Sequence, residues 1–356
     1  MVPLKLSPSK TRKEVVRIMM AGLVAFVQSS PAIGKSDIIR DIARQHNLFV
    51  IDLRLSQCEP TDLSGLPRFT EDGRAHYAPF QMFPLDGDEL PAKLDKNGKK
   101  QYDTNGDLIT YDGWMLFLDE ANSASRAVQA AAYKLVLDRM VGQRKLHPRV
   151  VIAMAGNLMT DKAITYELST AMQSRLIHLE MQINTKDWLD WAGKNDIDSR
   201  IQAFINFRPE LLSNFDPEHS DKTFAAPRTW HFASRLISGV PVDSDDLPLL
   251  AGTVGAGAAQ EFITFNQVFD SLPSIADIMH NPKTTQVPVE MAARYAMASY
   301  LTSVFDDERS TNIIIYLERF STEIQVLTLR MMMRKHEKVL MKPVFADLFK
   351  KLGSYL

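Results

Sequence analysis

Short, nearly continuous apolar runs alternate with segments of helical spacing through the first half of the chain. The five runs are residues 23–27, 49–53, 114–118, 149–155 and 176–181. Strands that helices cover on both faces have this composition. Because strands that alternate with helices form right-handed β–α–β units, we predict an α/β fold with a mainly parallel five-stranded sheet.

The pattern changes near residue 185, where the strand-like runs end and apolar positions recur at helical spacing. We expect helices at residues 187–191, 197–207, 228–237 and 261–269, and over most of 289–352. A chain of 356 residues is long for one core. We therefore predict an α/β core over residues 1–185, with an arm at residues 1–12, followed by helical regions.

A polar, turn-rich segment interrupts the core before its third apolar run. It carries Asn-Gly at residues 97–98 and again at 105–106, and Asn-Gly is the strongest short signal for a hairpin. We predict an insert at about residues 86–112 with a surface hairpin at 95–107. A calcium loop is the alternative, but the segment lacks the spaced acidic ligands and the closing Glu of an EF-hand. Residues 56–67 contain two prolines and a glycine and are expected to form a loop.

Composition narrows the class of protein. The chain is 45% hydrophobic with a net charge of −2, which gives no global attraction to nucleic acid or to an anionic membrane. The single cysteine, Cys58, excludes an internal disulfide, suggests a reducing compartment and is interpreted as structural. No apolar stretch reaches the roughly 18 residues that span a bilayer, and residues 1–17 lack a signal-peptide core. We expect a cytoplasmic protein.

The first apolar run leads into a phosphate-binding pattern. Residues 29–36 read SSPAIGKS, and a helix is expected at 36–46. Backbone N–H groups of such a loop and of the helix start favour an anion, Lys35 can reach the β- and γ-phosphates, and the Ser36 hydroxyl can bind Mg²⁺. Ser29 stands where the full pattern has a glycine. The predicted nucleotide-binding residues are Ser29, Ser30, Pro31, Ala32, Ile33, Gly34, Lys35, Ser36 and Asp37.

The third apolar run ends in two acids, Asp119 and Glu120. At the carboxyl edge of a sheet beside a phosphate loop, Asp119 would hold Mg²⁺ together with Ser36. Glu120 would polarise the water that attacks the γ-phosphate. The alternative is that two acids simply end a strand in solvent, and the phosphate loop upstream favours the catalytic interpretation.

Three further polar residues are candidates for contact with the γ-phosphate. Asn157 follows the fourth run through a glycine, where an amide can orient the attacking water or can merely turn a loop. Arg175 precedes the fifth run and could reach a neighbouring subunit's nucleotide; otherwise it is a surface charge. Arg228 follows Pro227 at a predicted helix start, from which a second domain could contact the phosphate.

Two groups in the helical half are interpreted as packing residues. Trp188, Trp191 and Trp230 are spaced as helix-packing residues, without the interleaved basic residues of a base-stacking surface. Residues 331–333 are three consecutive methionines, which favours a helix with a packing face over a nucleic-acid contact.

These elements occur in the order of an AAA+ ATPase, and the chain resembles the MoxR-like and dynein-related branch of that family. The resemblance covers residues ~15–240, and the remainder of the chain matches no family that we name. The segments that carry it are SQCEPTDLSGLP (56–67), FLDEANSAS (117–125), AGNLMTD (155–161), LSTAMQSRL (168–176) and APRTW (226–230). Relatives often have Pro-x-Ala where this chain has Ser-Thr-Ala at residues 169–171.

The resemblance implies a division of labour along the chain. Residues 1–185 would be the nucleotide-binding core, 186–258 a helical lid and 259–356 a helical C-terminal extension. Asn157 would be sensor 1, Arg175 the arginine finger and Arg228 sensor 2, acting with Glu120 on ATP and Mg²⁺. The family's members form ring hexamers and many remodel protein clients, often beside a von Willebrand factor A-type protein. The hairpin would face the pore or the client, and the protein would belong to the bacterial cytoplasm, host- or phage-encoded.

Two other functions remain as alternatives from the sequence. A DNA-associated motor or restriction-type nucleotidase, using GTP in some relatives, is disfavoured by the near-neutral charge and the lack of a recognisable DNA-binding module. A nucleotide-gated scaffold with little turnover is disfavoured because Asp119 and Glu120 are both present.

Overall fold

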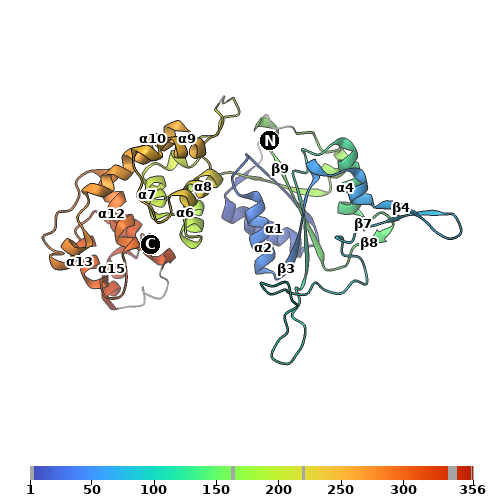
Figure 1. Cartoon of the computed structure of the whole chain (residues 1–356), viewed down its shortest axis with the longest axis horizontal. Coiled ribbons are helices and arrows are strands. Elements are labelled where there is room, and N and C mark those ends of the chain that lie inside the picture. The colour runs from blue at the N-terminus through green and yellow to red at the C-terminus, as the bar shows by residue number, and fades with distance from the viewer. Residues whose placement is uncertain (1–3, 162–164, 219–220, 336–342, 354, 356) are drawn as a thin grey trace. The chain divides into compact units, whose positions relative to one another are not determined.

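The computed structural model describes residues 4–161, 165–218, 221–335, 343–353 and 355. The chain divides into two compact units, Met1–Ile183 and Asn184–Leu356, and each is described by itself (Figure 1). The first unit is built on a sheet, and the second is helical over its described residues.

The first unit contains a six-stranded sheet in the order β1-β10-β2-β9-β6-β3, and every neighbouring pair is parallel. Five strands correspond to the five apolar runs: β2 (Val24–Ser29), β3 (Leu48–Arg54), β6 (Gly113–Asp119), β9 (Val150–Asn157) and β10 (Leu176–Met181). The predicted parallel α/β fold is therefore confirmed.

The sixth strand corrects the expectation of an N-terminal arm. β1 (Lys5–Leu6) pairs with β10, and α1 (Pro8–Met20) follows at once. The Oγ atom of Ser7 accepts a hydrogen bond from the backbone N–H of Lys10, and Pro8 occupies the first helical turn, where a missing N–H costs nothing. Pro8 thus marks a helix start here. Residues 1–3 of the expected arm lie outside the described residues.

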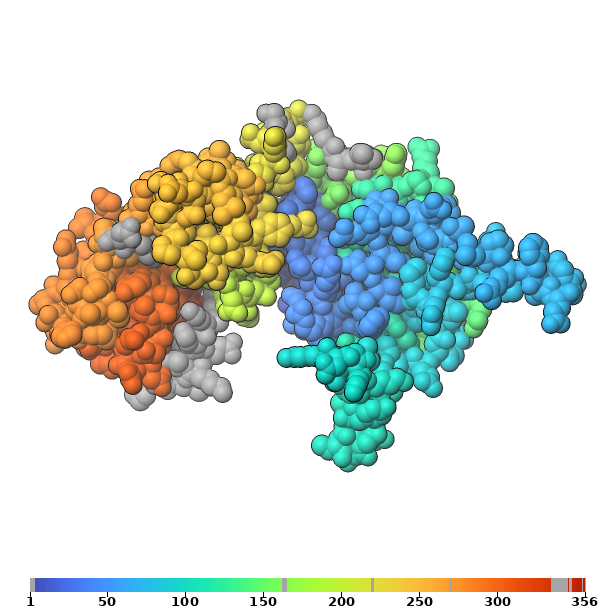
Figure 2. All heavy atoms as spheres, in the orientation of Figure 1, coloured from blue at the N-terminus to red at the C-terminus, as the bar shows by residue number. Residues whose placement is uncertain are grey.

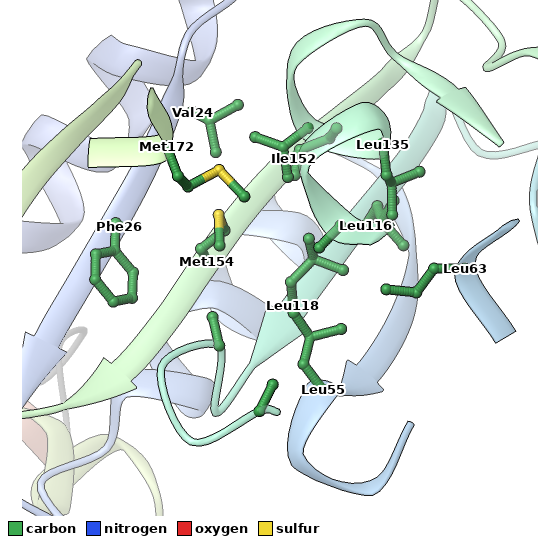
Figure 3. Close-up of a cluster of buried hydrophobic side chains, with 14 of the residues drawn as sticks. Val24, Phe26, Leu55, Leu63, Leu116, Leu118, Leu135, Ile152, Met154 and Met172 are labelled. Atoms are coloured by element: carbon green, nitrogen blue, oxygen red, sulfur yellow. The ribbon is translucent and has the colours of Figure 1, made fainter. Parts of the chain in front are cut away.

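Helices cover both faces of this sheet because alternate residues of its strands point to opposite sides. On one face, Met115 and Phe117 of β6 pack with α1 and with α2 (Lys35–Gln45). On the other face, Leu116 and Leu118 pack with α4 (Arg126–Leu137) and α3 (Pro60–Ser64), as Figure 3 shows for the second cluster. All four of these β6 side chains are fully buried, which accounts for the continuous apolar run.

The segment between β3 and β6 differs from the predicted loop and hairpin. Residues 56–67 contain a 3₁₀ turn, Leu55–Gln57, and α3, whose Leu63 packs into the core against α4. A hairpin of β4 (Leu66–Phe69) and β5 (Ala75–Ala78) follows, which the sequence reading missed. Another short hairpin, β7 (Met140–Val141) and β8 (Arg144–Lys145), follows α4.

Residues 91–111 contain both Asn-Gly turns but form more than one hairpin. This segment, and not the N-terminal arm expected at residues 1–12, is called the arm below. Three segments meet around a ring of backbone hydrogen bonds: Lys93 N–H to Ile109 O, Gln101 N–H to Lys93 O, and Ile109 N–H to Gln101 O. The carboxylates of Asp95 and Asp103 each accept two backbone N–H groups and so close the two turns. Figure 2 shows the arm, in teal, standing out from the first unit.

The second unit consists of helices with an aromatic core. Its described helices are α6 (Thr185–Lys194), α7 (Ser199–Phe207), α8 (Pro227–Ile237), α9 (Leu247–Val254), α10 (Ala256–Gln267), α11 (Ile275–His280), α12 (Met291–Ser303), α13 (Ser310–Leu317), α14 (Thr322–Lys335) and α15 (Pro343–Leu352). Short 3₁₀ turns at Pro209–Leu212, Ser244–Asp246 and Val268–Ser271 join some of them. Across the described residues, none of the helices combines the length and apolarity that crossing a membrane requires.

Two of the three tryptophans of this unit are buried as predicted, and Trp191 is half-buried beside the ring of His231. Trp230 is fully buried against Phe204 and Phe262, and its Nε1–H donates to the carbonyl oxygen of Leu211 at 2.8 Å. Trp188 is also buried. These contacts confirm that the two side chains belong to the core and are not exposed surfaces for stacking bases.

We expect Gly113→Ala to destabilise the first unit by about 1–3 kcal/mol, because the added methyl would overpack a backbone contact. A Cβ at residue 113 would lie 2.3 Å from the carbonyl oxygen of Arg149. Urea unfolding followed by circular dichroism measures the change. Gly252→Ala in α9 is the matched control, because nothing lies within 4 Å of its Cβ and alanine favours a helix. An unchanged unfolding midpoint for Gly113→Ala would show that this end of β6 shifts at little cost.

Candidate active site

Three neighbouring strands deliver polar residues to one edge of the sheet. β2 ends at Ser29, β9 at Asn157 and β6 at Asp119, and Ser29 pairs directly with Asn157 in the ladder. Because the strands are parallel, their carboxyl ends lie at the same edge, where ligands of open α/β sheets bind. The candidate residues at the ends of the first, third and fourth runs therefore lie at the same edge, although they are far apart in the sequence.

The loop from β2 to α2 is the predicted phosphate loop, in which Ser29 stands at the position of the first glycine. Gly34 has φ of 101° and Ala32 has φ of 61°, so the left-handed positions lie at these two residues. Ser29 is instead the last residue of β2 and is fully buried. A serine is accommodated there because this position does not require a positive φ.

Lys35 is held at the junction of this loop with β9. Its Nζ donates to the carbonyl oxygens of Ser29 and Ser30, at 2.9 and 3.2 Å. It also donates to Ser29 Oγ at 3.1 Å and to Asn157 Oδ1 at 3.2 Å. The Ser29 side chain is therefore one of the acceptors that hold the ammonium group, a contact that glycine could not make.

The two predicted magnesium ligands are in direct contact. Ser36 Oγ, in the first turn of α2, donates to Asp119 Oδ2 at 2.8 Å. The other carboxylate oxygen, Asp119 Oδ1, accepts the backbone N–H of Glu120 at 2.8 Å. A hydroxyl and a carboxylate are hard oxygen donors of the kind that Mg²⁺ prefers, so this donor set fits the metal beside a phosphate loop.

Glu120 lies next to these ligands in a strained conformation. Its φ is 54°, a left-handed value that is uncommon for a residue other than glycine and that clusters at functional sites. Its Oε2 accepts a hydrogen bond from the hydroxyl of Ser56. For Glu120 to act as the predicted base through this oxygen, its hydrogen bond with Ser56 must break, or Oε2 must accept a hydrogen bond from a water molecule as well.

Ser56 is a site residue that the sequence reading missed. The signal for it is the sheet order: β3 pairs with β6 so that Arg54 lies opposite Asp119. Residues just beyond that pair, Ser56 and Glu120, are then brought together. The motif positions do not show this, because they do not say which strand lies beside β6.

The two arginines predicted to contact the γ-phosphate are both exposed. Arg175 is exposed; its guanidinium lies over the ring of Tyr133 at 5.7 Å, and its Nη1 donates to the carbonyl oxygen of Ala171. It follows α5 (Thr170–Gln173), and the short turn Met159–Asp161 follows Asn157. Arg228 belongs to the second unit and is exposed in the first turn of α8.

The lone cysteine carries the properties of a structural thiol. Burial raises the pKa of Cys58, and the nearby Asp62 charge raises it further. Its Sγ donates to the carbonyl oxygen of Arg54. Because the thiolate is the reactive form, a raised pKa disfavours a nucleophilic role.

Comparisons with known proteins find distant structural likeness and no sequence match. No protein-family model and no curated protein matches the chain. A protein of Cytophaga hutchinsonii described as a "putative ATPase" aligns with a TM-score of 0.36 and 10% identity over 99% of this chain and 90% of that one. RuvB of Thermotoga maritima, a Holliday junction branch migration motor, aligns at 0.31 and 14% over 97% of this chain and 93% of that one. A RuvB mutant of the same organism aligns at 0.30 and 14%, over 99% and 97%. At these scores the likeness carries no argument about function.

We expect Ser29→Ala to raise the affinity for ADP by about three- to tenfold. The substitution removes the hydrogen bond from Lys35 Nζ to Ser29 Oγ, so this bond no longer has to be broken when Lys35 binds a phosphate. Fluorescence titration with a labelled nucleotide measures the change. Ser30→Ala is the matched control, since Lys35 contacts the carbonyl oxygen of that residue. A fall in affinity for Ser29→Ala alone would mean that the Ser29 hydroxyl serves the bound nucleotide.

Proposed function

We propose that the chain is a Mg²⁺-dependent ATPase of the AAA+ type. The observation that carries the proposal is the contact of Ser36 Oγ with Asp119 Oδ2 at the start of α2, with Lys35 and Glu120 beside it. This is the group of residues that phosphoryl transfer needs: a cation for the phosphates, oxygen ligands for a metal and a carboxylate for water.

Each residue of the cluster has one task in this proposal. The N–H groups at the start of α2 and the Lys35 ammonium bind the β- and γ-phosphates. Ser36 and Asp119 hold Mg²⁺, which would neutralise phosphate charge when bound. Glu120 takes the proton of the attacking water, and the Asn157 amide orients that water against the γ-phosphate.

The two arginines complete the proposed mechanism from outside the cluster. Arg175 donates from Nη1 to the carbonyl oxygen of Ala171, and its guanidinium lies over the ring of Tyr133. Its exposure supports a role as a finger that reaches the site of the next subunit in a ring, which we take to be a cytoplasmic hexamer. Arg228 would report the γ-phosphate from a lid at residues 186–258, ahead of an extension at 259–356.

The ring would act on a protein client, with a von Willebrand factor A-type protein as one candidate. We assign the client contact to the arm. Its own hydrogen bonds close it internally, and the side chains of Leu94 and Tyr102 are each more than half exposed. A projecting element of this kind can change without disturbing the sheet.

We expect Glu120→Gln to lower the kcat for ATP by at least about 100-fold while nucleotide binding persists, because the amide keeps the shape but cannot take a proton. Phosphate release from ATP and from GTP, with native mass recorded with and without nucleotide, measures turnover and assembly together. Glu71→Gln, in the exposed hairpin, is the matched control. A monomer that binds nucleotide without turnover would contradict both the mechanism and the finger role of Arg175.

We expect a shortened arm to leave basal turnover within about twofold, because exposed projecting segments tolerate truncation. The variant replaces residues 94–108 by an Asn-Gly turn, which keeps Lys93 and Ile109 paired. Phosphate release and native mass are compared with wild type. Loss of turnover or of the ring would place the arm in the catalytic or subunit contacts and not in client binding.

A further inference from the structure

Asn122 lies two residues beyond Glu120 and is almost completely buried, with 2% of its surface exposed. The backbone bond from Ser123 N–H to Glu120 O, at 2.9 Å, closes a turn around it. A polar side chain at this depth needs partners for its amide group. All of the partners recorded for that amide lie on the backbone of a single residue, Asn157.

The contact with Asn157 is reciprocal. Asn122 Nδ2 donates to the carbonyl oxygen of Asn157 at 2.8 Å, and the backbone N–H of Asn157 donates to Asn122 Oδ1 at 3.1 Å. The paired residues of β6 and β9 end at Leu118 and Met154, and Ala121 N–H then bonds to Ala155 O. The Asn122 side chain thus continues the ladder beyond β6 and fixes the last residue of β9.

Close packing holds this contact from the other side. A Cβ at residue 156 would lie 2.3 Å from Asn122 Oδ1 and 2.8 Å from the Phe26 ring. Gly156 is therefore required by space, since its φ is not among the positive values of the chain. The backbone at residues 156–157 has little room to move while Asn122 is in place.

The fixed backbone aims a side chain at the phosphate loop. Asn157 Oδ1 accepts from Lys35 Nζ at 3.2 Å. The backbone of Asn122 reaches a further segment, because its carbonyl oxygen accepts the N–H of Tyr166 at 2.6 Å. Asn122 therefore joins the loop that carries Glu120 to the amide of Asn157 and to the segment that leads towards Arg175.

We propose that Asn122 is a positioning residue that sets the Asn157 amide for contact with Lys35 and the γ-phosphate. The proposal rests on the proposed function, in which Asn157 orients the attacking water. Only asparagine supplies a donor and an acceptor at this length: aspartate lacks the donor, and glutamine carries one more methylene than the space beside Gly156 admits.

A double-mutant cycle on kcat tests the proposal. Asn157→Ala removes the side-chain amide but keeps the backbone N–H and carbonyl that Asn122 contacts. The contact with Asn122 is therefore present both in wild type and in Asn157→Ala, and the effect of Asn122→Ala can be compared between the two. We expect Asn122→Ala alone to lower kcat about 10- to 100-fold, with the KM for ATP changed less than threefold, because the amide is misplaced and not removed. In the Asn157→Ala background, we expect the same change to lower kcat by less than twofold.

Asn122→Asp is the second variant, since it keeps shape and volume but sets a carboxylate against the Asn157 carbonyl. It should lower kcat as Asn122→Ala does, because a carboxylate has no N–H to donate to that carbonyl oxygen. If Asn122→Ala fails to fold, the cycle is run with Asn122→Asp. Equal losses of kcat with and without the Asn157 amide would overturn the positioning role and leave only a structural one.

The proposed function and this inference fail in different ways. If wild type turns over neither ATP nor GTP, the proposed function is wrong and the inference falls with it. Suppose that wild type is active and that Asn157→Ala lowers kcat. If the double mutant then loses kcat by the product of the two single-mutant factors, the inference alone is wrong. Hydrogen exchange of the Asn157 backbone amide, measured without nucleotide, adds a readout besides turnover: it should quicken in Asn122→Ala, and an unchanged rate would contradict the proposal.

Discussion

The parallel pairing of β2, β9 and β6 is the constraint on which the candidate site depends. It brings Ser29, Asn157 and Asp119 to one edge, although 122 residues separate Lys35 from Asn157 and 83 separate Ser36 from Asp119. The strands hold this edge firmly because β6 is buried on both faces by helices. The polar groups of the candidate site are thus attached to strands that are packed on both faces.

Strained or crowded backbone recurs next to this edge. Gly34 and Ala32 take left-handed φ values in the loop between β2 and α2, Glu120 does so directly after β6, and Gly156 leaves no room for a side chain. For Ala32 and Glu120, which are not glycines, a left-handed conformation costs of order 1–3 kcal/mol and persists where surrounding contacts hold it. Here the helices on both faces and the ladder of parallel strands supply those contacts.

The polar contacts of the site form a chain and not a set of separate pairs. Ser56 holds the carboxylate of Glu120, Asn122 holds the backbone of Asn157, and Asn157 in turn contacts Lys35. Ser56 and Asn122 lie inside segments that carry the family resemblance, but neither is among the predicted site residues. Both act on motif residues from just beyond the end of a strand, in the way that an outer layer of hydrogen bonds orients a reactive group.

The sequence alone determined the strands of the core and the chemistry at their ends. Continuous apolar runs are required of strands buried on both faces, and Gly34, Lys35, Ser36, Asp119 and Glu120 form local patterns, so both can be read from neighbouring residues. Tertiary structure decided the features that depend on which residues are neighbours in space. β1 joins the sheet, and residues 60–64 form a helix that packs against α4. Ser56 donates a hydrogen bond to Glu120, and Asn122 donates one to the backbone of Asn157. Strand order and packing arise from contacts between distant residues, and a local pattern of polar and apolar positions carries no record of which distant residue will lie opposite.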